Sequence, residues 1–283
     1  MPATTSRRVT LDGVTLNVVT GGDGPAVLLL HGFPDRALLW REQIGALVDE
    51  GYRVIAPDLR GHGDSDRPVG AEHYGLRAVV DDLLALLDEL GADEVRVAGH
   101  DWGAATAWLL AAVAPERVAR LAAFSVGHPQ AFAAAGFGQK QLSWYMLWFQ
   151  FPGVAEAQLP ADDWALFREW AHDGAARGQD ALLDQQLSDL ERPGALTAAL
   201  GWYRANARPE FFVAGGGPEM PAIRCPVLGV WSDRDMALTE RQMTDSQRYV
   251  SGPWRYERIP RVGHWIPAHA PGRTTELLLE HFA

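Results

Sequence analysis

Three side chains that could act together in catalysis follow predicted strands. In chain order they are an aspartate in "GHDWGA" (Asp101), a carboxylate after "PVLGVW", and a histidine in "RVGHWIP" (His264). Nucleophile, acid and histidine in this order form one of the known catalytic triads. Because the sites of open parallel sheets form beyond the carboxyl ends of the strands, we expect these residues to meet there.

The segment "GHDWGA" has the pattern of a nucleophile elbow, a sharp turn between a strand and a helix that usually carries serine. Here Asp101 occupies the centre of the pattern. A serine attacks acyl carbon, whereas a carboxylate can displace a leaving group from sp³ carbon and become an ester itself. His264 would then activate a water that attacks the ester carbonyl.

The acid of the triad could be either Asp233 or Asp235 in "SDRDMAL". Its task is to hold the histidine tautomer and to stabilise the imidazolium. We favour Asp235, because it lies further along the loop and has room to turn back toward His264. The preceding core strand offers no alternative acid, since "FSVGHP" contains no carboxylate.

Each of these residues also has a structural interpretation when it is taken alone. Asp101 could cap the following helix, His264 could be a loop histidine, and both loop carboxylates could be solvated. The combination of three suitable residue types, in the right order and after the right strands, favours the catalytic interpretation.

Two backbone N–H groups are predicted to stabilise negative charge in this site. In a site built on such an elbow, one N–H comes from the loop after the first buried strand, and the other from the residue after the nucleophile. The loop is "HGFP" (31–34), so the predicted oxyanion hole consists of the amides of Phe33 and Trp102. We expect His31 to support this loop.

The elements around these residues alternate between strand and helix. Short apolar runs at 26–30, 53–57 and 94–99 predict buried strands, and apolar spacing over 76–90 predicts a helix that Gly91 ends. The N-terminal segment around Asp12 predicts a β-hairpin. This order predicts an α/β fold with a mostly parallel central sheet flanked by helices.

The alternation stops in the middle of the chain, where the segments are rich in Trp and Ala and have helical spacing. We therefore predict an all-helical insertion over 129–218. The α/β core is predicted to consist of 1–128 and 219–283.

The composition disfavours several other classes of protein. A net charge of −11 disfavours nucleic-acid binding, and the one cysteine, Cys225, cannot form an intrachain disulfide. The N-terminal segment has no apolar signal core, and no 18-residue apolar run occurs. We expect a cytoplasmic protein without membrane partners, metal or cofactor; its oligomeric state is left open, with a homodimer as one alternative.

Together, the segments "HGFPD", "DLRGHGDSD", "GHDWGA", "SDRD" and "GHW" resemble the α/β-hydrolase superfamily, in its epoxide hydrolase and haloalkane dehalogenase branch. The resemblance covers nearly the whole chain. It implies an α/β-hydrolase fold in which the helical insertion is a cap domain, and chemistry without a cofactor through an ester of Asp101.

The leaving group separates the two activities of this branch. An epoxide oxygen must be protonated, which tyrosine hydroxyls can do, whereas a halide needs only N–H donors. The segments "SWYMLWFQFPGVAE" and "GWYRANARP" resemble those that present two ring-opening tyrosines in epoxide hydrolases, which implies that Tyr145 and Tyr203 are the donors. The alternative is that both are packing residues of the cap. The resemblance departs at Gly201, where the family often has Asn.

The sequence therefore predicts an epoxide hydrolase that opens an apolar epoxide to a vicinal diol. We expect Trp148 and Trp202 to line an apolar substrate pocket. One alternative is a haloalkane dehalogenase with the same Asp101 and His264, since Trp102 would also suit a halide. A second is a hydrolase fold that only binds its ligand.

Overall fold

The computed structural model describes residues 4–176, 178–214 and 219–283. Within these residues the strands form one sheet in the order β1-β2-β4-β3-β5-β6-β7-β8. The strands are β1 (Thr4–Leu11), β2 (Val14–Gly21), β3 (Ala26–Leu30), β4 (Arg53–Pro57), β5 (Val95–His100), β6 (Val118–Phe124), β7 (Val227–Ser232) and β8 (Trp254–Ile259).

The sheet is mostly parallel, as predicted. Only β1 with β2 and β2 with β4 pair antiparallel among the described strands, and the remaining neighbours are parallel. The predicted hairpin is also confirmed: Leu11 pairs with Val14 across a turn in which Gly13 has a φ of 80°.

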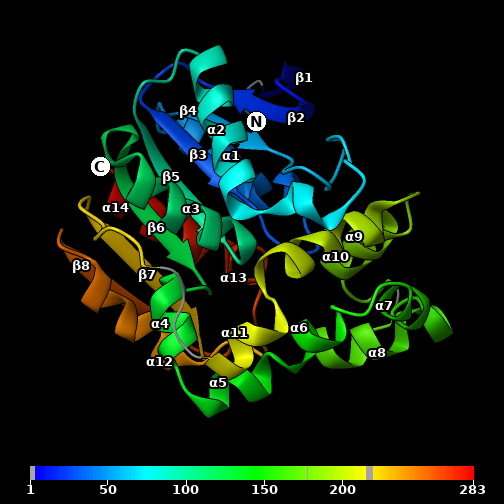
Figure 1. Ribbon diagram of the computed structural model, residues 1–283. Helices are drawn as coiled ribbons and strands as arrows, with labels where there is room; N and C mark the ends of the chain where they lie inside the picture. The colour runs from blue at the N-terminus through cyan, green and yellow to red at the C-terminus, as the bar shows by residue number, and fades with distance from the viewer. Residues whose placement is uncertain (1–3, 177, 215–218) are drawn as a thin grey trace.

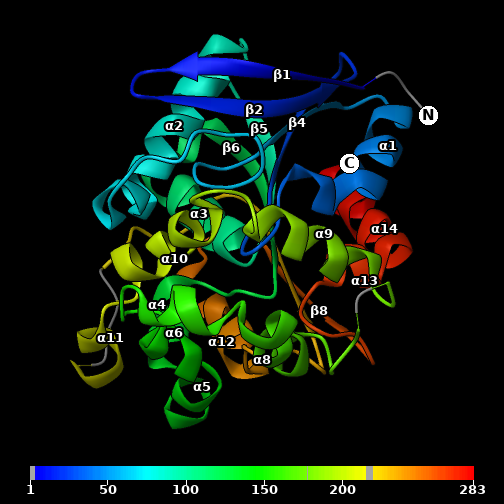
Figure 2. The same ribbon diagram turned by 90° about the vertical axis from the view of Figure 1, so that its right-hand side faces the viewer.

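Helices cover both faces of the sheet, and Figure 2 shows α2 and α3 on one side of the strands and α1 and α14 on the other. The core helices are α1 (Arg41–Asp49), α2 (Leu76–Glu89), α3 (Trp102–Val113), α12 (Glu240–Thr244), α13 (Ile266–His269) and α14 (Pro271–Phe282), with short 3-10 helices η1 (Ala37–Trp40), η2 (Ala71–Tyr74), η3 (Pro115–Arg117) and η4 (Asp245–Tyr249).

Strand β3 shows why the central strands are continuous apolar runs. Leu28 and Leu30 pack with residues of α2 and α3, whereas Val27 and Leu29 pack with residues of α1 and α14. All four side chains have no exposed surface. Since successive residues of a strand point to opposite faces, a strand that is covered on both faces needs apolar residues throughout.

A helical insertion lies between β6 and β7, and Figure 1 shows most of it gathered beyond the ends of the central strands. We call α4–α11 the cap helices: α4 (Pro129–Ala134), α5 (Phe137–Leu142), α6 (Trp144–Trp148), α7 (Val154–Gln158), α8 (Ala161–Ala171), α9 (Ala181–Leu190), α10 (Ala195–Asn206) and α11 (Pro209–Ala214). The domain limits stay a prediction, and the one at 218 lies outside the described residues.

Helix α10 is bound to the core beside η2. Asn206 donates from Nδ2 to the carbonyl of Tyr74 (2.9 Å) and accepts from the N–H of Leu76 (3.0 Å). The ring of Tyr74 lies directly against Gly201, where a Cβ atom would come within 2.7 Å of ring atom Cδ2. The departure at Gly201 therefore has a packing reason, because any larger residue would displace a buried ring.

We expect Gly201→Ala to lower the free energy of unfolding by about 1–3 kcal/mol, because the added methyl group overlaps the Tyr74 ring. Urea denaturation would measure the change. Gly45→Ala is the matched control: Gly45 lies within α1, and its Cβ would meet nothing within 4 Å. It should gain about 0.5–1 kcal/mol from helix propensity. If the two substitutions changed the free energy of unfolding equally, the contact with Tyr74 would not be the reason for a glycine at position 201.

None of the helices in the described part of the chain is both long enough and apolar enough to cross a membrane.

Candidate active site

The nucleophile elbow is formed by Asp101, between the end of β5 and the start of α3. Its backbone has φ 53° and ψ −121°, which is rare for a residue with a side chain. The turn is tight enough that a Cβ atom on Gly103 would lie 2.2 Å from the carbonyl oxygen of Leu30. The glycine two residues after the nucleophile therefore allows the helix to start against β3.

The loop after β3 holds the carboxylate of Asp101. The backbone N–H of Phe33 donates to Asp101 Oδ1 at 2.8 Å. Trp102 is the first residue of α3, so its N–H is among those that have no partner within a helix. The Phe33 contact places one predicted oxyanion donor at the nucleophile, and the role of the Trp102 amide stays a prediction.

His31 supports this loop, as expected. Its Nε2 accepts a hydrogen bond from the N–H of Leu59 (2.9 Å), and its Nδ1 lies 2.9 Å from the carbonyl oxygen of Gly32. With Nδ1 as the protonated nitrogen, both contacts are satisfied. Burial lowers the pKa of His31, although nearby carboxylates oppose the shift. The residue thus links the Phe33 loop to the loop after β4.

His264 lies between two carboxylates. Its Nε2 is 3.6 Å from Asp101 Oδ2, and its Nδ1 is 2.9 Å from Asp235 Oδ2. Asp235 also accepts from the N–H groups of Ala237 and Leu238. Of the two candidate acids, the structure therefore brings Asp235 to the histidine.

Asp233 has a different set of contacts. Its Oδ1 accepts from the N–H of Arg261 at 2.6 Å, and its Oδ2 lies 3.5 Å from a guanidinium nitrogen of Arg258. These contacts tie the loop after β7 to β8 and to the turn that follows it.

The charges of the site reinforce one another. Burial alone would lower the pKa of His264, but Asp235 and Asp101 outweigh it and raise the pKa to about 10. Burial also disfavours the charged form of Asp101 and would raise its pKa, but His264 and the N–H of Phe33 hold the pKa below its usual value. The two carboxylates thus favour the protonated form of His264, and His264 favours the ionised form of Asp101.

Tyr145 and Tyr203 come from the cap helices α6 and α10, and both face the cavity that contains Asp101. Their ring centroids are 5.8 Å apart. Burial raises the pKa of each hydroxyl well above 10, and the negative charge of Asp101 adds to the shift. Both hydroxyls therefore keep their protons at neutral pH.

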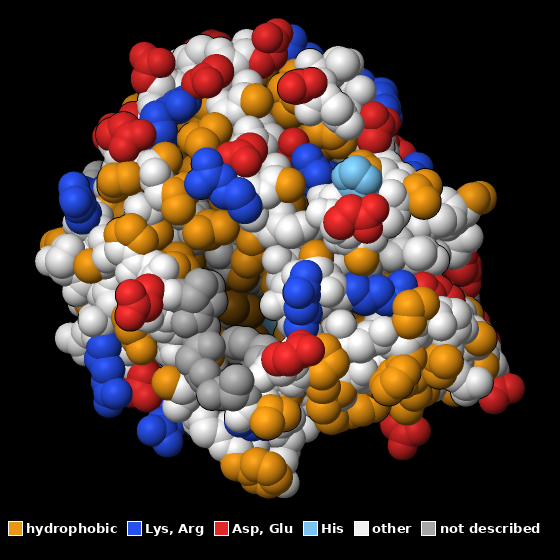
Figure 3. All heavy atoms as spheres, in the orientation of Figure 1, with side chains coloured by type: hydrophobic (Ala, Val, Ile, Leu, Met, Phe, Trp, Pro, Cys, Tyr) orange, Lys and Arg blue, Asp and Glu red, His pale blue; other side chains and the backbone are white. Residues whose placement is uncertain are grey.

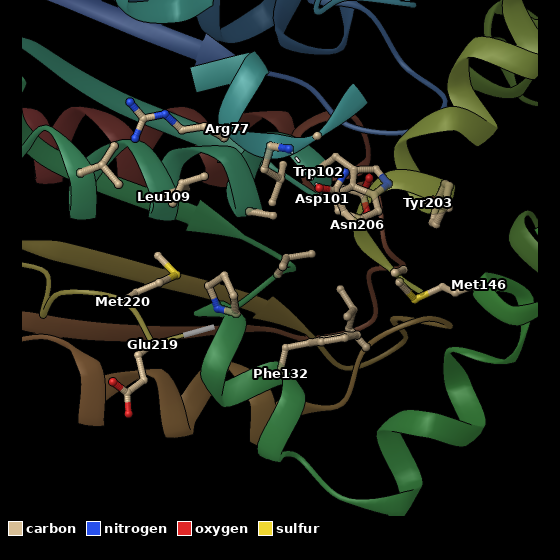
Figure 4. A pocket seen from close by; sticks show the side chains of 18 of the residues that line it. Arg77, Asp101, Trp102, Leu109, Phe132, Met146, Tyr203, Asn206, Glu219 and Met220 are labelled. Carbon is tan, nitrogen blue, oxygen red and sulfur yellow. Dashed lines mark hydrogen bonds between the residues drawn. The ribbon is translucent and has the colours of Figure 1, made fainter. Parts of the chain in front are cut away.

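The cavity has a volume of about 480 Å³ and is mainly apolar. Ala105, Leu109 and Val113 form a stripe along one face of α3. From Trp102 to Val113 this stripe is about 16 Å long, at a rise of about 1.5 Å per residue. Figure 4 shows Asp101 and Tyr203 toward one end and Leu109 and Met220 toward the other. On the face drawn in Figure 3, hydrophobic side chains lie at the edge of a hollow and inside it.

The two predicted pocket tryptophans do not line this cavity. Trp202 has no exposed surface, and its indole N–H donates to the carbonyl of Arg60 at 3.1 Å. Trp148 stacks on Trp144, with ring centroids 6.1 Å apart. Adjacent residues of a helix point about 100° apart, so when Tyr203 faces the cavity, Trp202 faces the core.

Other wall residues were not identified from the sequence, including Phe132, Met146 and Met220. The stripe on α3 could have been found, because positions 102, 105, 109 and 113 follow helical spacing from the nucleophile. The others lie on segments whose orientation the spacing does not give.

Asp35, in "HGFPD", is a second buried carboxylate near the nucleophile. It accepts from Gln186 Nε2 of α9 (2.9 Å) and from Trp265 Nε1 (3.0 Å). Burial raises its pKa to about 7. Through these bonds Asp35 joins the Phe33 loop, a cap helix and the residue after His264.

Comparison with known proteins agrees with this geometry. Residues 25–271 match the family described as alpha/beta hydrolase fold. Epoxide hydrolase A of Mycobacterium tuberculosis is 35% identical, over 99% of this chain and 98% of its own length. The AB hydrolase superfamily protein YfhM of Bacillus subtilis is 34% identical, over 96% of each chain.

Solved structures lead to the same group. The crystal structure of epoxide hydrolase A from Mycobacterium thermoresistibile has a TM-score of 0.81 and 31% identity, over 99% of this chain and 98% of that one. An epoxide hydrolase structure from hot-environment metagenomes has a TM-score of 0.87 and 29% identity, with the same coverage. The chain belongs to the α/β-hydrolase fold family, in the branch that contains the epoxide hydrolases.

Proposed function

We propose that this chain is an epoxide hydrolase, a hydrolase of ether bonds that converts an apolar epoxide to a vicinal diol through an ester of Asp101. The observation that carries the proposal is the placement of two tyrosine side chains and one carboxylate at a single, mainly apolar cavity. The carboxylate can attack carbon, and the hydroxyls can protonate the oxygen that leaves it.

In the first step Asp101 attacks a ring carbon and the carbon–oxygen bond of the epoxide breaks. The electron pair goes to the epoxide oxygen, which takes a proton from Tyr145 or Tyr203. Because the N–H of Phe33 donates to Oδ1, we assign the attack to Oδ2, which lies 3.6 Å from His264 Nε2. The products are a hydroxyalkyl ester of Asp101 and a tyrosinate.

The ester also changes the state of His264. Alkylation removes the charge of Asp101, which is one of the two charges that raise the pKa of His264 in the resting site. The imidazolium then loses its proton more readily, and this proton restores the tyrosinate. His264 is left neutral, as a general base must be.

In the second step His264 takes a proton from a water that attacks the Asp101 carbonyl carbon. Negative charge develops on Oδ1, where the N–H of Phe33 already donates, and the N–H of Trp102 is the proposed second donor. Asp235 stabilises the imidazolium that forms. When the ester bond breaks, the leaving oxygen takes the proton of the new carboxyl group, which releases the diol and leaves Asp101 ionised.

The cavity also indicates the kind of substrate. The apolar stripe on α3 leads away from Asp101 and provides a wall for a hydrocarbon arm. We propose that the epoxide ring lies between Asp101 and the two tyrosines, with its apolar substituent along α3.

One observation favours a second candidate, a haloalkane dehalogenase. The indole N–H of Trp102 is buried at the cavity, beside the ring of Tyr203, whose centroid lies 5.1 Å from that of Trp102. Such a donor could bind a halide ion. A halide needs no proton, however, so this activity would leave the two tyrosine hydroxyls without a task.

The test is a comparison of products, combined with an isotope label. The purified enzyme should release diol from an aryl or alkyl epoxide and no halide from a matched haloalkane. In a single turnover in H₂¹⁸O, the label should enter Asp101 and not the diol, because water attacks the ester carbonyl. Mass spectrometry of the enzyme and of the diol measures this, and label in the diol formed in that single turnover would contradict an ester intermediate.

A further inference from the structure

The turn after β6 is centred on Ser125, a residue with an unusual backbone. Its φ is 66°, in the left-handed region that favours glycine. The N–H of Val126 donates to the carbonyl of Phe124 at 2.8 Å, which closes a three-residue turn around Ser125. Tight turns with positive φ at the centre are rare and strained for a residue with a side chain. A glycine would relieve the strain, so the side chain of Ser125 needs an explanation.

The surroundings of Ser125 hold it in this conformation. Its N–H donates to the carbonyl of Val230 at 2.9 Å, and its carbonyl accepts from Gln242 Nε2 at 2.8 Å. The residue has no exposed surface. Strain that persists under such constraint is often found where a side chain must be aimed in one direction.

That direction is the backbone of His264. The hydroxyl of Ser125 donates to the carbonyl oxygen of His264 at 2.9 Å. The same oxygen accepts from His100 Nε2 at 3.0 Å and from the N–H of Ile266 at 2.8 Å. Burial lowers the pKa of His100 to about 3, so His100 is neutral and donates from this nitrogen.

These bonds hold the backbone of His264, whereas Asp235 holds its ring. His100 is the last residue of β5, and Ser125 directly follows β6. Both are therefore anchored in the sheet next to the elbow. They restrain the backbone of His264, and the bond between Nδ1 and Asp235 restrains the rotation of the ring. The remaining nitrogen, Nε2, is thereby held 3.6 Å from Asp101.

We propose that Ser125 is a positioning residue for ester hydrolysis, and that its strained turn serves to aim its hydroxyl at the backbone of His264. This inference rests on the proposed function. It concerns the second step because water activation requires Nε2 at one distance from the Asp101 carbonyl carbon. The first step depends on Asp101 itself, which the elbow and Phe33 already hold.

The test uses two substitutions that remove the hydroxyl in different ways. Ser125→Ala keeps the strain, whereas Ser125→Gly relieves it. We expect ester hydrolysis to slow about 5- to 10-fold in both, as expected for one lost hydrogen bond. Rapid quench followed by intact mass should show the ester accumulating during turnover. Because kcat/KM reports alkylation, it should stay within about twofold, while kcat and KM fall together.

Stability provides the second readout. Ser125→Gly should unfold at a higher temperature than Ser125→Ala, because glycine adopts the positive φ without strain. The hydrolysis rates should nevertheless fall together, since both variants lack the hydroxyl. A hydrolysis rate that follows stability instead would show that Ser125 is only structural and would overturn the proposal.

Ser65→Ala is the matched control. Its hydroxyl is also buried and donates to a backbone carbonyl, that of Asp58, but it does not contact the His264 loop. We expect ester hydrolysis at the wild-type rate in this variant. If wild-type enzyme forms no ester with any epoxide, the proposed function fails. If it forms one and the Ser125 variants hydrolyse it at the wild-type rate, only this inference fails.

Discussion

Replacing His264 with glutamine should stop diol formation and leave the enzyme as a stable ester of Asp101. Glutamine fills similar space but cannot take a proton from water, so the second step loses its general base. We expect turnover to fall by roughly 10²–10⁴-fold, the usual contribution of such a base. The first step needs the carboxylate of Asp101, to which the N–H of Phe33 still donates in this variant. Intact mass should therefore increase by the full mass of the epoxide.

The mass of the adduct also separates the two candidate activities. A haloalkane would add its own mass less that of the hydrogen halide. His269→Gln is the matched control, since His269 lies nearby on α13 but faces Asp180, with 3.9 Å between Nε2 and Oδ2. This variant should turn over the epoxide at the wild-type rate and accumulate no ester. Turnover within about tenfold of wild type in His264→Gln would contradict the role assigned to the histidine.

The double substitution of Tyr145 and Tyr203 with phenylalanine should block the first step instead. Without a proton donor the ring oxygen would leave as an alkoxide in an apolar cavity, which is costly. We expect alkylation to slow by about 10²–10⁴-fold. Each single substitution should cost less, because the remaining hydroxyl still reaches the same oxygen. Single-turnover kinetics would measure the loss, and no ester should accumulate.

Tyr256→Phe is a control for this pair. Its hydroxyl donates to Glu240 at 2.8 Å and lies outside the cavity. Alkylation should proceed normally in this variant. If the double variant kept full epoxide turnover, the proton would have to come from another donor and the assignment of the tyrosines would be wrong.

Much of the fold could be predicted from the sequence because burial on two faces leaves a clear pattern. The run at 26–30 is apolar at every position and forms a central strand, and the spacing over 76–90 forms α2. The approach of Asp101, His264 and Asp235 could be predicted for a related reason. Each follows a parallel strand, and such strands end at the same edge of the sheet.

The walls of the cavity could not be predicted in the same way. Trp202 and Tyr203 are neighbours on α10, and the helix phase that turns one toward the cavity turns the other toward Arg60. In this orientation Gly201 and Asn206 contact the segment around Tyr74, which is far from α10 in the chain. The positive φ of Ser125 could not be predicted either, because serine is not a residue type that indicates this conformation.

The cap insertion leaves and rejoins the core at one place. Pro129 and Met220 both border the cavity, and the N–H of Met220 donates to Gln130 Oε1 at 3.2 Å. A segment that starts and ends at one point can be lengthened, shortened or exchanged while the core stays intact. The two tyrosines and part of the cavity wall belong to this segment, whereas Asp101 and His264 do not. Evolution could therefore change what the protein accepts, and even which bond it breaks, while it inherits the nucleophile unchanged.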